Sequence, residues 1–209
     1  MQGSFVAILS GIQHDEACLT GDIRTIHSDF EECFKQAGTR DNSEDMNEPS
    51  WNPAAKSASI RKWAEHLHRE SKCVFLKDKT HAQILFLFKD TGLVSITPVP
   101  PNTEHIQIYD AVRRAIKDNN LYAVIHVGEA WSYFIKEGKD HTAFQLMDGE
   151  MKVSDLNDAD RSECLHLRME SRDGDCVVYL DKIVRDGDKL VLGAGRTVPD
   201  EDLKWFEQG

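Results

Sequence analysis

The stretch CLHLRMESRDGDCVVYLDKIVRDGDKLVLGA, residues 164–194, decides the fold. It contains three β-rich runs separated by two identical Arg-Asp-Gly-Asp segments, 172–175 and 185–188. An Asp-Gly pair between alternating strands is a strong hairpin signal, because both residues of a two-residue turn need positive φ. The pattern therefore predicts a three-stranded antiparallel meander over Cys164–Ser171, Cys176–Val184 and Lys189–Ala194.

Hydrophobic spacing outward from the meander predicts the remaining elements. The predicted helices cover 22–36, a segment starting at Ser57 or Ser59, 103–117 and 200–207. The predicted strands cover 83–89, 93–97 and 121–135, and the first two are joined at Asp90-Thr91-Gly92 as a hairpin. Residues 136–160 follow neither period and are predicted to be a loop.

From residue 57 onward the order is α-β-β-α-β-β-β, which predicts an α+β fold. We expect a single antiparallel or mixed sheet of about six strands with helices on one face. Residues 13–50 hold ten Asp or Glu and three Lys or Arg. We therefore predict an acidic helical N-terminal extension and linker over 1–56, followed by an α+β domain over 57–209. A solvated helix face and a docking arm for a basic partner both fit this extension.

Composition narrows the class of protein. The 209 residues carry a net charge of −11, which argues against sequence-independent binding to nucleic acid or to an anionic membrane. No apolar run approaches the roughly 18 residues of a spanning helix, and the first residues lack the basic region of a secretory signal. Five widely spaced cysteines indicate reduced thiols in a cytoplasmic protein.

Motifs for cofactors and metals are absent from the sequence. It contains no Gly-x-Gly-x-x-Gly, phosphate-binding loop, His-Glu-x-x-His or Gly-x-Ser-x-Gly pattern. His66 and His68 lie on a predicted helix, where positions i and i+2 point about 200° apart and cannot chelate one ion. The two Asp-Gly-Asp turns lack the spaced ligands of a calcium loop. We therefore predict no cofactor and no metal.

Glu129 is the most informative single position. In the strand over 121–135 it alternates in phase with larger apolar side chains, those of Ile125, Val127, Trp131 and Tyr133. Strict alternation would bury the carboxylate, which is costly unless it is paired or protonated. Two interpretations stay open. In the first, Gly128 forms a β-bulge that turns Glu129 toward solvent or toward an arginine. In the second, Glu129 is a buried carboxylate with a raised pKa, suited to acid–base catalysis or to metal binding.

The first turn of the meander predicts a second candidate. If Asp173-Gly174 is a two-residue turn, His166 lies directly opposite Asp181, where the two Cβ atoms are about 4.5–5.5 Å apart. An Asp that orients a His is part of several catalytic devices, and it is also an ordinary cross-strand pair. The same register places Arg168 opposite Tyr179, on the same face of the meander as His166 and Asp181. That face is less apolar than the other one. Arg168, Tyr179 and Trp131 are the candidate binding residues.

Two resemblances accompany these features. The strand with Gly128-Glu129-Ala130-Trp131, followed by Asp160-Arg161-Ser162-Glu163, is similar to a group of bacterial proteins of unknown function over about residues 121–197. That likeness implies no activity. The element order resembles that of the roadblock and profilin-like domains, which implies a binding or scaffold module.

Two functions are compatible with the sequence. The first is a non-catalytic binding or scaffold module of the bacterial cytoplasm, which binds a protein partner or self-associates through a sheet edge or its helical extension. The alternative is a small hydrolase-like enzyme that uses Glu129 with the His166–Asp181 pair, with or without a divalent metal ion. It requires these groups to converge within about 4–6 Å. The absence of nucleophile and cofactor motifs favours the first.

Overall fold

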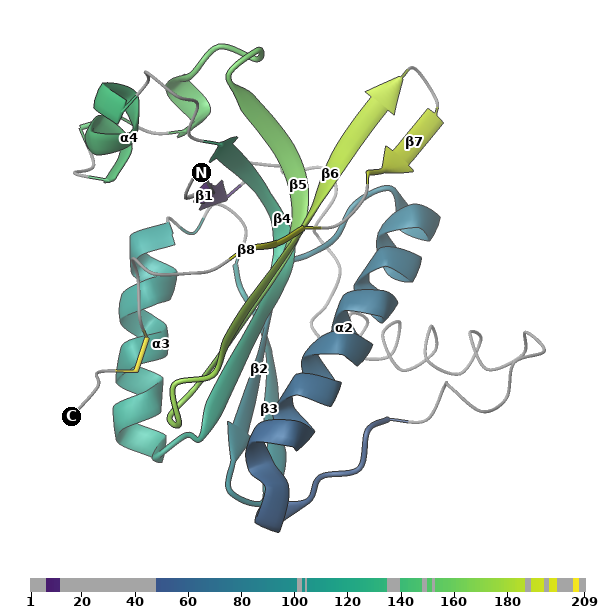
Figure 1. The fold of residues 1–209 in the computed structure, drawn as a ribbon, viewed down its shortest axis with the longest axis vertical. Helices are drawn as coiled ribbons and strands as arrows, with labels where there is room; N and C mark the ends of the chain where they lie inside the picture. Colours follow the sequence, from purple (N-terminus) through teal and green to yellow (C-terminus); the bar gives the residue numbers. More distant parts are fainter. Residues whose placement is uncertain are drawn as a thin grey trace, which may run out of the picture.

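An antiparallel sheet runs through the part of the chain that the computed structural model describes (Figure 1). The described residues are 7–11, 48–100, 103, 105–134, 140–147, 150–151, 153–186, 189–193, 196–198 and 205–206. The strands are β1 Ala7–Gly11, β2 Ile84–Lys89, β3 Gly92–Pro98, β4 Ala123–Phe134, β5 Arg161–Ser171, β6 Cys176–Asp186, β7 Lys189–Leu192 and β8 Arg196–Val198. Their order is β3-β2-β4-β5-β6-β7, with β1 also paired to β4 and β8 to β6. The predicted α+β class and single antiparallel sheet are confirmed.

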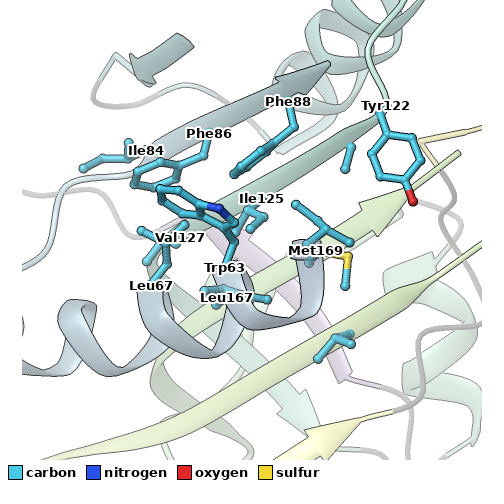
Figure 2. Close-up of a cluster of buried hydrophobic side chains, with 14 residues drawn as sticks. Trp63, Leu67, Ile84, Phe86, Phe88, Tyr122, Ile125, Val127, Leu167 and Met169 are labelled. Carbon is cyan, nitrogen blue, oxygen red and sulfur yellow. The ribbon is translucent and has the colours of Figure 1, made fainter. Parts of the chain in front are cut away.

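The helix α2, Lys56–Asp78, covers one face of the sheet (Figure 1). Figure 2 shows Trp63 and Leu67 of this helix packed against the central strands. The strand residues of this cluster include Ile84, Phe86, Phe88, Ile125, Val127, Leu167 and Met169. All are buried, so this layer is the larger hydrophobic core among the described residues.

The helix α3, His105–Asn119, covers the opposite face (Figure 1). Its Ile108 and Val112 pack with Val124 of β4 and with Leu85 and Leu87 of β2. The expectation that helices lie on one face is therefore wrong. The physical reason lies in the continuous apolar run Ile84–Phe88, because a strand that is apolar at successive positions must be covered on both faces.

Four further elements were not predicted. The predicted loop over 136–160 contains the short helix α4, Asp140–Met147, and the 3-10 turn η3, Val153–Asp155. The strand β8 was not predicted, and a second 3-10 turn, η2 Pro53–Ala55, precedes α2. The predicted helix over 22–36 lies outside the described residues, as does most of the predicted extension over 1–56. Of the predicted tail helix only Trp205 and Phe206 are described.

The turn between β5 and β6 corrects the predicted register. Glu170 pairs with Cys176, and the Ser171 amide donates to the Asp175 carbonyl at 2.9 Å, so the turn spans three residues, 172–174. Only Gly174 has positive φ within it, at 84°. This extra residue moves the register by one, so that His166 opposes Leu180 instead of Asp181.

The second turn also differs from expectation. A two-residue turn at Asp186-Gly187, the second Asp-Gly pair of the meander, would have placed Asp181 opposite Leu192, but Asp186 pairs with Lys189. Ile183, and not Asp181, therefore opposes Leu192.

No described helix is both long enough and apolar enough to cross a membrane.

Candidate functional site

Glu129 lies on the α2 face of β4 and is only 1 % exposed. The β4–β5 register runs without a shift from Ala123 opposite Ser171 to Tyr133 opposite Arg161, so the β-bulge that one of the two interpretations placed at Gly128 is absent. Gly128 instead lets β4 approach Gln83 closely, since a Cβ at position 128 would lie 3.0 Å from the Gln83 Cα atom. Strict alternation therefore buries this carboxyl group in the core.

Three donors surround the Glu129 carboxyl group. Helix α2 ends at Asp78 and is capped by Lys79, which adopts the left-handed conformation and donates its backbone N–H to the Phe75 carbonyl. This cap turns the chain back onto the sheet, where the Thr80 hydroxyl (2.9 Å) and the His81 backbone N–H both donate to Glu129 Oε1. Arg185 Nη2 donates to Oε2 at 3.2 Å. The buried Glu129 carboxyl group thus accepts hydrogen bonds from two residues that follow α2 and from one residue of β6.

Arg185 joins two halves of the sheet that separate at this point. The described β5–β6 pairing ends at Cys164 opposite Lys182, and beyond it β6 pairs with β7, so the β6–β7 hairpin leans away from β5 (Figure 1). Across this gap Arg185 donates to Glu163 of β5 through Nη2 (2.6 Å) and Nε (3.0 Å), and its Nη1 donates to the Lys79 carbonyl at 3.1 Å. One guanidinium therefore links β6, β5, β4 and the end of α2.

The environment of Glu129 changes its acidity. Burial raises the pKa of Glu129 to about 7, the hydrogen bonds from His81 and Thr80 oppose the rise, and the nearby Glu163 carboxyl group adds to it. A carboxyl group that exchanges a proton near neutrality can act as a general acid or base when a substrate reaches it. Such a group also forms part of some structural networks.

Asp181 is fully buried on the same face of the sheet as Glu129. Its carboxylate contacts His68 Nε2 and Lys72 Nζ, the latter at 2.7 Å, so two side chains one turn apart on α2 hold it. Tyr179 stacks on the His68 ring with centroids 4.3 Å apart. Burial alone would raise the pKa of Asp181, but the hydrogen bonds and charges of His68 and Lys72 outweigh it and hold that pKa below its ordinary value.

The predicted catalytic residues do not converge. His166 points to the α3 face, where its Nε2 lies 3.3 Å from His126 Nδ1, and it is therefore on the opposite side of the sheet from Glu129 and Asp181. The predicted His166–Asp181 pair is wrong, because the three-residue turn moves Asp181 beneath α2. Glu129 and Asp181 share one row across the strands, with Leu165 between them.

The predicted binding residues are likewise separated. Arg168 lies on the α3 face and donates to Glu170 at 3.0 Å, whereas Tyr179 lies with His68 on the α2 face. Trp131, further along β4, has the Arg161 guanidinium 4.3 Å above its ring. Sequence reasoning missed His68 and Lys72, although their spacing of four residues places both on one side of a helix. Within the described ranges, no group of three or more His, Cys, Asp and Glu side chains is placed to hold a metal ion.

The comparisons with known proteins identify the family. Residues 20–206 match the family model described as bacteriophage lambda protein ea47. The chain belongs to the Ea47 family. No curated protein and no solved structure matches it. A family named for a bacteriophage protein is compatible with the predicted likeness to bacterial proteins of unknown function. The comparisons show no likeness to roadblock or profilin-like domains.

Proposed function

We propose that this Ea47 family member is a non-catalytic binding module of the bacterial cytoplasm that joins a second copy of itself through the edge of β3. The observation that carries the proposal is the composition of that edge. β3 stands at the end of the strand order and pairs, among the described residues, with β2 alone. Its seven residues, GLVSITP, include no charged side chain, and Val94 and Ile96 are 46 % and 37 % exposed.

The opposite edge of the sheet supports this choice by contrast. β7 begins at the exposed Lys189, which pairs with Asp186, so charge flanks that edge. Proteins commonly protect edge strands from pairing with another chain by placing charged residues there. β3 has no charged residue, and its protective features are the shift of its register against β2 between Leu87 and Phe88 and its last residue, Pro98. An uncharged edge of this length is suited to accept another strand through backbone hydrogen bonds.

A second copy fits this edge better than an arbitrary strand does. Antiparallel pairing with the two-fold axis at Ser95 would place Val94 of each copy opposite Ile96 of the other. The exposed apolar side chains would then cover one another, which favours association. Each chain carries a net charge of −11, so two copies repel one another overall. The paired β3 strands contain no charged residue, so they would place no like charges opposite one another.

Sedimentation velocity of the full chain tests the proposal. We expect wild-type protein to dimerise at micromolar concentrations and Val94→Lys or Ile96→Lys to remain monomeric, because a lysine on the edge opposes strand pairing. Ile106→Lys is the matched control, since Ile106 is an exposed apolar residue of α3 away from β3. A wild-type chain that stays monomeric throughout this range, or an Ile106→Lys variant that dissociates equally, refutes the proposal.

The enzyme alternative required Glu129, His166 and Asp181 to converge. His166 lies on the other face of the sheet from Glu129 and Asp181, so an enzyme built on these three residues is not proposed. The pKa of Glu129, raised by burial to about 7, is by itself compatible with a structural network as well as with proton transfer. A melting temperature that rises with Mg²⁺, Mn²⁺, Zn²⁺ or Ca²⁺ in wild type, and does not rise in Glu129→Ala, would reopen the enzyme alternative.

A further inference from the structure

The α3 face of the sheet holds a buried carboxylate that the proposed function does not use. Glu170 of β5 is 3 % exposed. Its Oε2 accepts a hydrogen bond from the Trp205 backbone N–H at 2.8 Å, and its Oε1 accepts one from the Phe206 backbone N–H at 2.9 Å. Two consecutive amides thus bind the two oxygens of one side chain that lies 35 positions earlier in the chain.

Arg168 completes the polar part of this contact. Its Nη2 donates to Glu170 Oε2 at 3.0 Å, and its guanidinium carbon lies 4.5 Å from the centre of the Trp205 ring. The arginine therefore compensates the buried charge of Glu170. It also stacks on the ring of Trp205, the residue whose backbone N–H donates to the same carboxylate. Both side chains come from one strand and are two residues apart, so β5 fixes their relative position.

The aromatic side chains fill an apolar seat next to this carboxylate. Trp205 and Phe206 are 4 % and 7 % exposed and pack in one cluster with Ile108, Val112, Leu121 and Val124. The seat is formed by α3 and by the residues around the start of β4. Consecutive backbone amides that converge on an anion are a common way to bind an anionic group, and here the anion belongs to the body of the protein.

We propose that Glu170, Arg168 and this apolar seat form a peptide-binding site for adjacent aromatic residues, which is occupied here by the chain's own Trp205-Phe206 and accepts the same segment from a second copy. The described contacts of the site are made by two consecutive residues, so the same contacts are available when another molecule supplies those two residues. The chain's own segment has the advantage of a high effective concentration, so binding in trans is weak while that segment is in place.

A labelled peptide tests this site in the full chain. The fluorescein-labelled peptide DEDLKWFEQG, residues 200–209, is titrated by fluorescence anisotropy into a Trp205→Ala/Phe206→Ala variant, the emptied variant, whose apolar seat lacks both aromatic side chains. We expect saturable binding, at least tenfold weaker binding to wild type, and no binding of a peptide with both aromatic residues replaced by alanine.

Glu170→Gln in the emptied variant should weaken binding at least tenfold, because a Gln side chain presents only one acceptor oxygen to the two amides. Glu65→Gln, on the exposed side of α2, is the matched control and should leave the affinity unchanged. An emptied variant that keeps its wild-type circular dichroism but does not bind the peptide overturns the proposal. So does equal binding by the Glu170→Gln protein.

Photo-crosslinking of wild-type protein keeps the proposal testable if the emptied variant does not fold. The same peptide, with benzoylphenylalanine in place of Phe206, is used in large excess and the products are mapped by mass spectrometry. Crosslinks to α3 around Ile108 and Val112 support the site. Crosslinks only elsewhere, or none, refute it.

Discussion

Replacing Glu129 by Gln tests whether burial keeps this carboxyl group neutral near pH 7. Gln preserves the shape of the side chain and an acceptor oxygen for Thr80 and His81, but it cannot ionise. In wild type the folded-state pKa is about 7, compared with an ordinary value of 4.5. The folded protein therefore binds this proton more tightly than the unfolded chain does.

The sign and size of the effect follow from proton linkage. Stability contributed by a raised pKa is fully present below pH 4.5 and is lost as the pH rises through 7. At about 1.4 kcal/mol per pH unit, the rise from 4.5 to about 7 gives a loss of roughly 3 kcal/mol. The Gln variant lacks this loss. Its free energy of unfolding relative to wild type should therefore improve by roughly 3 kcal/mol between pH 4.5 and 8.

Urea unfolding of both proteins at half-unit pH intervals measures this difference. Other titrating groups, including Asp181, are present in both proteins, so to first order their contributions cancel in the difference. Glu65→Gln, which removes an exposed carboxylate, is the control for the loss of one charge. A difference between Glu129→Gln and wild type that stays constant over this pH range would refute the reasoning. It would show that Arg185 keeps Glu129 ionised throughout.

Two further substitutions test the packing around the α2 face. Asp181→Asn leaves Lys72 and His68 beside a neutral amide and should cost roughly 3 kcal/mol at pH 7, measured by urea unfolding. Because the pKa of Asp181 is lowered, that difference should shrink as the pH falls below 3.8, and a cost under about 1 kcal/mol at pH 7 would contradict the ion pairing. Gly128→Ala should cost about 1–3 kcal/mol, because the new Cβ would lie 2.7 Å from Gln83 Cγ. Gly193→Ala, where the nearest atoms are 3.5 Å away, is the control, and equal losses at the two positions would refute the steric argument.

The strand and helix positions could be predicted because their signals are local. Alternation and turn residues located β2 to β7, and helical spacing located α2 and α3. The placement of helices on both faces was missed, although the unbroken apolar run Ile84–Phe88 indicated it. α4 was missed because its eight residues carry too short a pattern to stand out from a polar loop.

The candidate site was predictable only in part, because its contacts join distant segments. The phase of the strand predicted a buried Glu129, but the role of Gly128 depends on Gln83, which lies 45 positions earlier. The partners of Asp181 depend on the length of one turn, and an Asp-Gly pair is compatible with turns of two or three residues. Nothing local to Glu170 indicates that Trp205 and Phe206 bind to it.

The turn between β5 and β6 has a consequence for how this chain tolerates mutation. Side chains alternate along a strand, so one residue added to or removed from 172–174 would turn β6 over and carry Asp181, Ile183 and Arg185 to the wrong layer. Adding two residues would restore the phase. In a mutational scan that includes insertions and deletions, single-residue changes in the length of this turn should be rejected. Single substitutions should cost less, even at Arg172 and Asp173, whose side chains bond to residues 120–122. At this position the number of residues should therefore constrain the fold more strongly than their identity does.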